Sequence, residues 1–406
     1  MIPAIMCVGD SICSEKLDKF NNEKIGKIPL YERILINLIN EGFNKVYIVT
    51  KKNIFLELNN ISSPVDIKYI ELSDLGKIKE DLLIFQNNIV INKKQLTKSL
   101  EEISKTKNSC TCIDYEKHFT GISFVKQNDL NLIKSAKSTK EFEELTISEP
   151  PLLLKEGDLG SNKGRDFLFS HISKNVSGWV SKNINSRISI PVSKVLMKFN
   201  IHPNTITFFV GCLGISCGLF YASNNPLIGA LVLQMATILD RCDGEVARIT
   251  LKESKFGQWF DTALDQLSYF SMFIGIATCL NNPSFFPLTN VNILIKQFSI
   301  INILLYIIFI TTVLFFMIRR TSNGSLAYYP GEVDKRVPIE ERSLFYRLIS
   351  KYRFLLKREF FSPAMIFGSF LGYKFLAITA LILFIFGLYH QVSDYIALKE
   401  KTDITY

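Results

Sequence analysis

Apolar residues are distributed unevenly along this 406-residue chain, and the change near residue 200 constrains the fold most strongly. Before that point Lys, Asn, Glu and Ile dominate, and no apolar run reaches the roughly 20 residues that cross a bilayer as a helix. After it, long apolar runs predict about six membrane-spanning helices, at 204–223, 227–250, 258–280, 297–318, 357–372 and 374–393. We therefore expect an all-α polytopic membrane domain over 201–395, followed by a short cytosolic tail at 396–406.

The last apolar region, 360–389, is also long enough for a single over-long helix. Gly372-Tyr373-Lys374 offers a turn within it, however, and two tilted helices account for its length better. We therefore place the fifth and sixth helices on either side of this turn.

Lys and Arg residues between the predicted helices set the expected orientation, because cytosolic loops carry an excess of both. The connections 250–257 and 319–358 are basic, whereas the alternate connections carry only Lys296 and Lys374. Both termini are therefore expected on the cytosolic side of an integral membrane protein. The formal net charge of +9 fits an anionic membrane surface better than a nucleic acid partner, which we do not expect.

Four carboxylates lie between two of the apolar runs, at Asp240, Asp243, Asp261 and Asp265. Charges near the hydrocarbon core are costly, so a cluster of one sign requires bound cations. The first two are three residues apart and the last two four residues apart, so each pair projects from one helical face. Two facing pairs would form an oxygen cage on the cytosolic side, which suits hard divalent ions. We predict that these side chains bind two ions, Mg²⁺ or Mn²⁺.

The residues around these carboxylates follow the spacing D-x2-D-G-x2-A-R-x8-G-x3-D-x3-D from Asp240 to Asp265. This spacing resembles the signature of the CDP-alcohol phosphotransferase family at all eight fixed positions. The resemblance implies an enzyme of phospholipid or inositol-phosphodiester biosynthesis that transfers a phosphoalcohol group from a CDP-alcohol to an acceptor hydroxyl. CMP is released, and no covalent enzyme intermediate forms. An incidental acidic helix end is the alternative interpretation.

Each residue of the motif can be given a physical role in such a reaction. Cations at the four carboxylates would neutralise the diphosphate and stabilise the leaving CMP phosphate. Asp265 comes last in the cage and is our candidate general base for the acceptor hydroxyl. Four further residues are expected to accommodate the CDP group, the first two by leaving space and the others at the cytosolic mouth: Gly244, Ala247, Arg248 and Gly257.

The substrates are less constrained than the reaction. The motif binds the shared CDP part, so CDP-diacylglycerol and a CDP-inositol-like donor both fit. Four basic residues near the cytosolic mouth are candidates to bind an acceptor phosphate through charge-assisted hydrogen bonds: Lys182, Arg187, Arg319 and Arg320. They fit equally well as positive-inside residues in contact with lipid headgroups. If they bind phosphate, the acceptor is an inositol phosphate or glycerol phosphate.

Two segments precede the first predicted membrane helix. Residues 151–175 include the stretch Lys155–Arg165, rich in Gly and Ser, and are expected to be a flexible linker. In 176–200, apolar residues alternate with Lys and Arg at helical spacing, with a break at Pro191, which predicts helices lying in the membrane interface. A packed soluble linker is the alternative. The following His202–Thr207 resembles the entry to the first membrane helix of the same family.

Residues 1–150 are expected to form a cytosolic α/β domain of Rossmann type. Ile2–Val8, Lys45–Thr50 and Leu82–Gln86 are predicted strands, and Pro29–Glu41 is a predicted amphipathic helix. A strand, a helix and a strand in this order favour a parallel sheet.

This domain resembles sugar-nucleotide-type nucleotidyltransferases in its opening strand, in Ile28–Arg33 and in the strand near Leu83. The whole chain is similar to a fused family in which an inositol-phosphate cytidylyltransferase precedes a CDP-alcohol phosphotransferase. An active nucleotidyltransferase needs a glycine-rich phosphate loop, but Met6–Ser14 contains one glycine and an added acid. Asn87-Asn88 replaces the expected metal-binding aspartate. We therefore predict a non-catalytic domain kept for folding, dimerisation or docking, in a homodimer.

Two other function classes compete with the phosphotransferase. A transporter would need charges near mid-membrane or broken helices in repeated halves, and the sequence shows neither. A catalytically inactive membrane scaffold would explain the degenerate first domain, but the four intact aspartates argue against it. The eight scattered cysteines do not suggest a disulfide framework, and Cys110-x-Cys112 is a weaker candidate for a metal or redox site.

Overall fold

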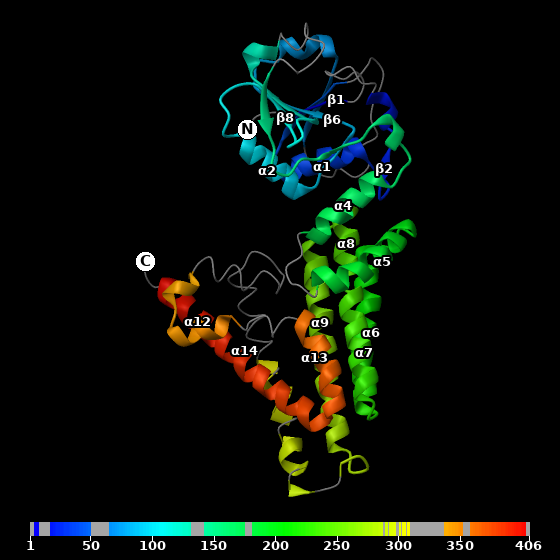
Figure 1. The fold of residues 1–406 in the computed structure, drawn as a ribbon, viewed down its shortest axis with the longest axis vertical. Coiled ribbons are helices and arrows are strands. Elements are labelled where there is room, and N and C mark those ends of the chain that lie inside the picture. Colours follow the sequence, from blue (N-terminus) through cyan, green and yellow to red (C-terminus); the bar gives the residue numbers. More distant parts are fainter. Residues whose placement is uncertain are drawn as a thin grey trace. The chain divides into compact units, whose positions relative to one another are not determined.

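A computed structural model describes residues 4–7, 17–49, 65–130, 142–174, 181–286, 337–351 and 358–402, with shorter stretches between 289 and 308. Contacts divide the chain into two units, which we describe separately (Figure 1). The first unit comprises residues 1–175 together with 249–251. The second comprises 176–248 and 252–406.

The first unit is built around a seven-stranded sheet with the strand order β10-β8-β9-β6-β1-β4-β5. These strands are β1 (Ala4–Cys7), β4 (Lys45–Val49), β5 (Asp66–Ile70), β6 (Leu82–Gln86), β8 (Cys110–Ile113), β9 (Phe119–Val125) and β10 (Glu143–Thr146). Strands β6, β1, β4 and β5 run parallel to one another, as the strand–helix–strand pattern predicts. Strand β9 runs antiparallel to both β6 and β8, so the sheet is mixed. The predicted α/β region is confirmed.

Two helices pack apolar side chains onto this sheet, α1 (Leu30–Asn40) and α2 (Lys93–Ile103) (Figure 1). Helix α1 begins after Pro29, and its buried leucine and isoleucine residues join the core. Helix α2 begins with a capping box, in which Asn92 and Gln95 each accept a hydrogen bond from the other's backbone N–H. The smaller elements are β2 (Lys24–Ile25), β3 (Ile28–Pro29) and 3₁₀ turns at Leu17–Phe20, Leu72–Lys77, Gln127–Asp129 and Glu156–Asp158.

Residues 151–174, which we expected to be a linker, contain regular structure within the first unit. Strand β11 (Leu152–Leu153) pairs antiparallel with β7 (Ile89–Val90). Helix α4 (Lys163–Lys174) follows and buries Phe169. Contacts accordingly assign residues 151–175 to the first unit.

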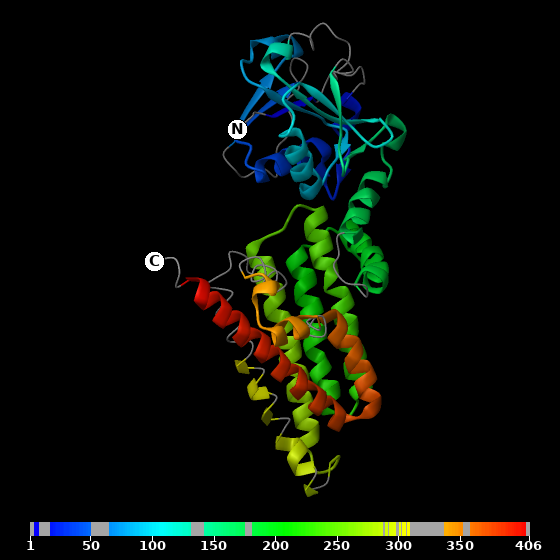
Figure 2. The same ribbon diagram turned by 60° about the vertical axis from the view of Figure 1, so that its left-hand side comes forward.

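The second unit is helical. It contains α5 (Ser186–Lys198), α6 (Pro203–Ala222), α7 (Pro226–Leu239), α8 (Arg241–Ile249), α9 (Lys255–Asn281), α12 (Leu344–Ser350), α13 (Arg358–Leu371) and α14 (Tyr373–Thr402). A π-helical turn precedes α5 at Ser181–Asn185, and a 3₁₀ turn precedes α12 at Ile339–Glu341. In both ribbon views α6, α7 and α9 run side by side, and α14 runs obliquely to them (Figure 2).

Helices α6 and α9 approach closely along a seam of small residues. A Cβ placed on Gly275 of α9 would lie 2.2 Å from the carbonyl oxygen of Gly218 in α6, a distance that only glycine permits. Across the same seam the hydroxyl of Ser271 donates to the carbonyl oxygen of Ile215 at 2.6 Å. This contact fixes α9, and the acidic residues it carries, against α6.

Two of the described helices, α6 and α9, are long and apolar enough to cross a bilayer. The predicted number of six is not confirmed. The predicted span 227–250 is wrong as a single helix, because α7 ends and α8 begins around Asp240. The last two predicted spans correspond to α13 and to the longer α14, with Gly372 between them. Most of the predicted span 297–318 lies outside the described residues.

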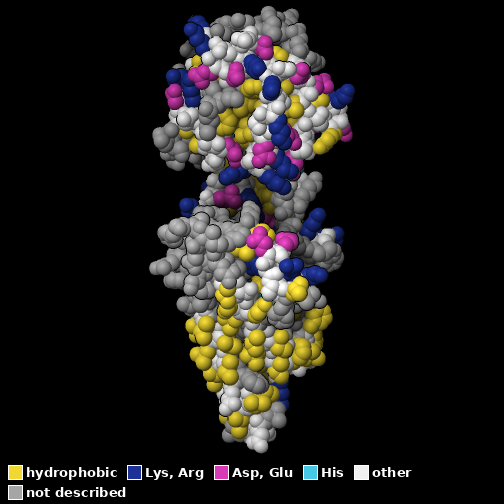
Figure 3. Space-filling model, turned by 90° about the vertical axis from the view of Figure 1, so that its left-hand side faces the viewer, with side chains coloured by type: hydrophobic (Ala, Val, Ile, Leu, Met, Phe, Trp, Pro, Cys, Tyr) yellow, Lys and Arg dark blue, Asp and Glu magenta, His cyan; other side chains and the backbone are white. Residues whose placement is uncertain are grey.

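Large apolar side chains are exposed along the outer sides of these helices, and they cover much of the face of the helical unit drawn in Figure 3. Examples are Phe208, Phe209 and Leu219 on α6, Leu231 and Met235 on α7, Trp259 and Ile274 on α9, Phe367 on α13 and Ile382 on α14. Soluble monomers rarely expose contiguous apolar surface on this scale. The outer sides of the helices are therefore suited to contact with lipid.

Candidate functional site

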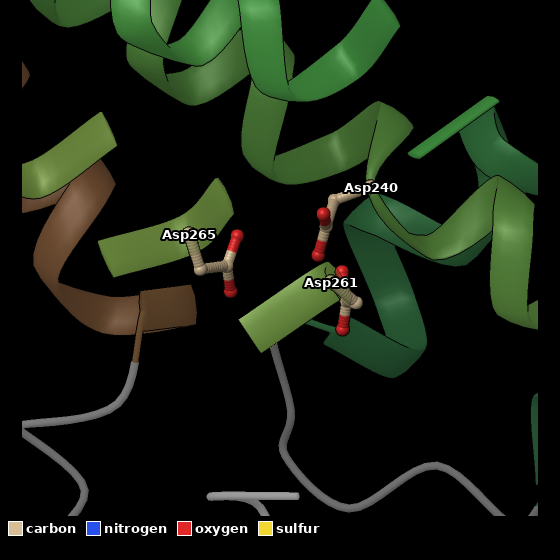
Figure 4. A group of neighbouring side chains, drawn as sticks. All are labelled: Asp240, Asp261 and Asp265. Atoms are coloured by element: carbon tan, nitrogen blue, oxygen red, sulfur yellow. The ribbon is translucent and has the colours of Figure 1, made fainter. Parts of the chain in front are cut away.

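Three carboxylates converge in the helical unit. Asp240 lies at the junction of α7 and α8, and Asp261 and Asp265 lie one turn apart on α9. One oxygen of each carboxylate lies within 4.8 Å of the others, and Figure 4 shows the three side chains grouped together. All three residues are partly buried. We call them the Asp triad.

Helix boundaries position the Asp triad. Asp240 is the single residue between α7 and α8, and its backbone angles are helical (φ −52°, ψ −33°), so its side chain projects at the end of α7. Helix α9 begins after Ser254, whose Oγ accepts a hydrogen bond from the backbone N–H of Gly257 at 2.9 Å. Asp261 and Asp265 then follow four residues apart, and this spacing places both on one face of α9.

The fourth predicted ligand, Asp243, does not belong to this group of three carboxylates. It is buried in α8, and its Oδ2 accepts a hydrogen bond from the hydroxyl of Thr207 in α6. Its Oδ1 accepts a hydrogen bond from the backbone N–H of Gly244. Sequence analysis did not identify Thr207 as a site residue. The signal was present, however, because Thr207 closes the segment beginning at His202 that resembles the family's first helix entry.

The composition of the Asp triad fits a divalent cation. Three carboxylate groups this close repel one another unless positive charge lies between them. Their donor atoms are all oxygens, which hard ions such as Mg²⁺ and Mn²⁺ prefer. The candidate metal site predicted from the acidic motif is therefore present in the structure, with three of its four residues brought together.

The four residues predicted to accommodate the CDP group lie on α8 and at the start of α9. The guanidinium of Arg248 lies beside Gly244, since a Cβ placed on this glycine would be 3.4 Å from the nearest guanidinium nitrogen. Ala247 is partly buried and Arg248 is exposed. A Cβ placed on Gly257 would lie 3.1 Å from Asn204 Oδ1. Small residues thus keep the starts of α6 and α9 close together.

The predicted acceptor-phosphate residues are only partly described. Lys182 precedes α5 and Arg187 lies in its first turn, and both are exposed. Arg319 and Arg320 lie outside the described residues.

In the first unit, Asn87 and Asn88 follow β6, where we expected the metal-binding aspartate of an active nucleotidyltransferase. Both are buried. The Asn87 amide donates to Asn21 Oδ1 at 2.7 Å, and the Asn88 amide donates to the carbonyl oxygen of Leu154 at 2.8 Å. Through these hydrogen bonds the two side chains join the end of β6 to Asn21 and Leu154. Much of the predicted phosphate loop around Gly9 lies outside the described residues.

Cys110 and Cys112 lie on β8, and both thiols are buried. A hydrogen bond with Cys112 lowers the pKa of the Cys110 thiol to about 7, and the same hydrogen bond together with burial raises the pKa of Cys112. Among the described residues, the Asp triad is the group of three or more side chains that could bind a metal ion. Neither cysteine belongs to it.

Comparison with known proteins identifies the helical unit. Residues 200–339 match the CDP-alcohol phosphatidyltransferase family. The chain contains a CDP-alcohol phosphatidyltransferase domain. This domain includes helices α6 to α9, and therefore the Asp triad, Asp243 and Thr207. The resemblance stated from the motif is confirmed.

The chain is also similar in sequence to proteins named as transferases and synthases. The bifunctional IPC transferase and DIPP synthase of Aquifex aeolicus is 28% identical over 216 residues, which are 48% of this chain and 49% of that protein. The archaetidylinositol phosphate synthase of Pyrococcus horikoshii is 33% identical over 86 residues, or 21% of this chain and 46% of that protein. This chain thus spans about half the length of these relatives. A solved phosphatidylinositol phosphate synthase of Mycobacterium tuberculosis with CDP-DAG bound is 13% identical and covers 52% of this chain and 93% of its own, with a TM-score of 0.35.

Proposed function

We propose that the protein transfers a phosphoalcohol group from a CDP-alcohol to an acceptor hydroxyl and releases CMP. The convergence of Asp240, Asp261 and Asp265 within the phosphatidyltransferase domain is the observation that carries this proposal. An inactive scaffold has no evident need for three carboxylates whose oxygens lie this close together, because like charges at short range repel one another.

The proposed reaction is a direct displacement at phosphorus. The acceptor oxygen forms a bond to the phosphorus that carries the alcohol, the bond from this phosphorus to the oxygen bridging to CMP breaks, and CMP leaves with the bonding electron pair. We propose two ions, Mg²⁺ or Mn²⁺, with the Asp triad and Asp243 as ligands. Bound cations would neutralise the diphosphate and stabilise the charge that develops on the leaving phosphate.

Asp265 is the proposed general base. A base at this step takes the proton from the acceptor hydroxyl as its oxygen attacks. Asp265 lies one turn further along α9 than Asp261, whereas Asp240 adjoins α8, the helix that carries the proposed nucleotide residues. This placement supports an acceptor on the Asp265 side and the nucleotide on the α8 side.

The CDP group is proposed to bind along α8. Gly244 and Ala247 provide room on this helix, and the exposed guanidinium of Arg248 lies beside Gly244. Arg248 can therefore donate charge-assisted hydrogen bonds to a phosphate that passes over the glycine. Gly257 keeps the neighbouring start of α9 free of a side chain.

The acceptor is proposed to be an inositol phosphate, with glycerol phosphate as the alternative, and the donor CDP-diacylglycerol or a CDP-inositol-like molecule. The names of the archaeal and bacterial relatives favour inositol phosphate chemistry. Four basic residues are proposed to contact the acceptor phosphate: Lys182, Arg187, Arg319 and Arg320. The described pair, Lys182 and Arg187, is exposed and available for such a contact.

The protein is proposed to be embedded in a bilayer through its helical unit, with the active site and both termini on the cytosolic side. The exposed apolar sides of α6, α7, α9, α13 and α14 support membrane insertion. The basic connections between the predicted spans support the orientation. We propose a homodimer in which the first unit serves folding, dimerisation or docking.

A substrate panel tests the proposed function. Full-length protein in detergent is supplied with CDP-diacylglycerol or CDP-inositol and with inositol phosphate, glycerol phosphate or no acceptor, and CMP is measured. We expect CMP release that depends on both a CDP-alcohol and a phosphorylated acceptor. Absence of CMP release with every pair would refute the proposal for these substrate classes.

A further inference from the structure

Glu245 is a fully buried carboxylate for which the proposed reaction has no use. Its exposed fraction is 0%, although it lies within the acidic motif on α8. Its two oxygens accept hydrogen bonds from the hydroxyls of Ser189 and Ser193 in α5, each at 2.7 Å. Burial of a charged group is expensive unless its hydrogen bonds are made. The serine hydroxyls of α5 meet this requirement for Glu245.

Arg241 adds a second polar connection between the same two helices. Its guanidinium lies 3.7 Å from Glu245 Oε1, one helical turn away, and donates to the hydroxyl of Ser186 in α5 at 3.0 Å. We call these five residues, Ser186, Ser189, Ser193, Arg241 and Glu245, the serine–glutamate latch. Hydrogen bonds to an ionised group are stronger than neutral ones, so the latch is a specific attachment.

Helix α5 is oriented with its serine side toward α8. All three latch serines are buried, whereas Ile188, Val195 and the following Phe199 are exposed by 46%, 49% and 74%. An amphipathic helix on a soluble protein has the opposite arrangement, with its apolar stripe toward the core. Val192 and Leu196 of α5 also pack against an apolar cluster that includes Cys242 and Val246 of α8. The latch adds directed hydrogen bonds to this apolar contact, and together they set which side of α5 faces α8.

Helix α8 needs such lateral support. It has nine residues and is separated from α7 by Asp240 alone, so its contacts with α5 add to the attachment that α7 gives it. Helices of this length are marginal on their own. By helical spacing, Glu245 lies on the side of α8 opposite Asp243 and Ala247. A rotation of α8 about its axis would therefore release Glu245 and redirect Asp243 together.

We propose that Glu245 is a positioning residue, which joins α8 to α5 through Ser189 and Ser193 and so sets the direction in which Asp240 and Asp243 project. This inference rests on the proposed function, because it assigns Glu245 a role in placing the proposed metal ligands. Glu245 itself binds neither metal nor substrate in this account.

The reactivity of the Cys242 thiol measures whether α5 stays attached to α8, and this measurement does not depend on enzymatic activity. Its thiol is buried, and it donates to the carbonyl oxygen of Ser189 at 3.6 Å, so α5 covers it. Labelling of the full-length protein with a maleimide, followed by peptide mass analysis, gives a reaction rate for Cys242 separately from that of the exposed Cys212 on α6. A latch that opens should expose Cys242.

Four variants test the proposal. Glu245→Ala removes the acceptor, and the double variant Ser189→Ala/Ser193→Ala removes the donors while leaving α8 unchanged. Glu245→Gln keeps the size of the side chain and can accept from one serine while donating to the other. Glu253→Gln is the matched control, because it neutralises an exposed carboxylate close to α8.

The measurements are Cys242 labelling and binding of Mn²⁺ alone, the latter by calorimetry on detergent-solubilised full-length protein. For Glu245→Ala and the double serine variant we expect faster Cys242 labelling and a loss of Mn²⁺ affinity of about 10- to 100-fold, the effect typical of residues that orient metal ligands. Glu245→Gln should retain most of the wild-type affinity, and Glu253→Gln should match wild type in both measurements.

If Glu245→Ala does not fold, the double serine variant still tests whether the latch positions the metal ligands. Unchanged Cys242 labelling in this variant would show that the serines do not hold α5, and faster labelling with unchanged Mn²⁺ affinity would show that the latch does not position the ligands. Either result overturns the inference. A wild-type protein that binds Mn²⁺ but releases no CMP would instead contradict the proposed function, while the labelling and binding results would still test the latch.

Discussion

Thr207 connects the first apolar helix to the acidic motif. Its hydroxyl donates to Asp243 in α8, and with the backbone N–H of Gly244 it satisfies both oxygens of this buried carboxylate. Removal of a hydrogen-bond partner from a buried acceptor costs about 1–3 kcal/mol. The contact therefore contributes to the stability of the helical unit as well as to the orientation of Asp243.

Replacing Thr207 with valine keeps the shape of the side chain and removes its hydroxyl. We expect Thr207→Val to lower the free energy of unfolding by about 1–3 kcal/mol and to slow CMP release, because Asp243 loses the group that orients it. Thr207→Ser is the matched control, since it keeps the hydroxyl and should stay close to wild type. Thermal unfolding and CMP release measure the two effects. A valine variant as active as the serine variant would show that this hydrogen bond does not matter for turnover.

Asp265→Asn tests the assignment of the general base. We expect this variant to bind the CDP-alcohol, because the other aspartates still provide metal ligands, while its rate falls by roughly two to four orders of magnitude. Asp240→Asn should weaken both binding and turnover, since Asp240 adjoins the proposed nucleotide residues on α8. Calorimetry follows donor binding, and CMP release follows turnover. A rate within a few-fold of wild type for Asp265→Asn would reassign the base to Asp261 or to a metal-bound hydroxide.

The residues of the Asp triad were predictable from the motif, because their spacing along the chain reflects the helical faces they occupy. Their partners were not. Thr207 and Asp243 are 36 positions apart, and Glu245 and Ser189 are 56 apart. No periodicity links positions so distant, and only the packing of the helices brings them together. That Asp243 does not belong to the group of three carboxylates was unpredictable for the same reason.

At the scale of secondary structure elements, the packing of α6 against α9 determines where Asp261 and Asp265 lie. Glycine residues on α6 alternate with serine and leucine residues of α9 along the seam, and added Cβ atoms would clash with Leu264, Ser268 and Ser271. In a lipid environment, helices associate through such close contacts between small residues. The seam is thus the main structural constraint on the α9 side of the site.

Gly275→Ala should weaken this seam. The new methyl group would collide with the backbone carbonyl of Gly218, which cannot move away as a flexible side chain can. We expect a loss of about 1–3 kcal/mol in the free energy of unfolding, the usual cost of overpacking. The control is Ile274→Leu at the adjacent exposed position on α9, which should be neutral. Thermal unfolding in detergent compares the two, and equal midpoints would argue against a close α6–α9 contact.

Hydropathy predicted the location of the helices better than their continuity. The stretch 227–250 is apolar enough to suggest one span, but its charged second part forms a separate helix after Asp240. The apolar first part alone does not show where the first helix ends, because the helical backbone angles continue through Asp240. The pattern of apolar and basic residues predicted helices in 176–200, and α5 lies in this range. The inward-facing serines of α5 became apparent only from their contacts with Glu245.

At the scale of the whole molecule, the two units were evident in the sequence from the change in composition near residue 200. The parallel part of the sheet followed from alternating strands and a helix, and β1, β4, β6 and α1 lie where they were predicted. The antiparallel β9 was not predicted, because strand direction depends on pairing between distant segments. The structure in 151–174 was missed because its Gly and Ser residues suggested a linker.

The first unit is predicted to lack nucleotidyltransferase activity. Asn87 and Asn88 occupy the position expected for a metal-binding aspartate, and their amides form hydrogen bonds within the unit. We expect no formation of CDP-alcohol from CTP and a phosphoalcohol by the full-length protein, measured as pyrophosphate release. Consumption of added CDP-alcohol by the same preparation is the control for intact protein. Robust CTP-dependent synthesis would show that the first unit is catalytic.

The central claim is that the Asp triad binds the divalent cations on which CMP release depends. The most direct measurement is the rate of CMP release by the full-length protein, with Mg²⁺ or Mn²⁺, after addition of a chelator, and after the metal is restored in excess. We predict that release stops in chelator, returns with the metal, and is slower in Asp240→Asn than in wild type whenever the metal is present. Full turnover in chelator, or wild-type turnover by Asp240→Asn, would contradict the account.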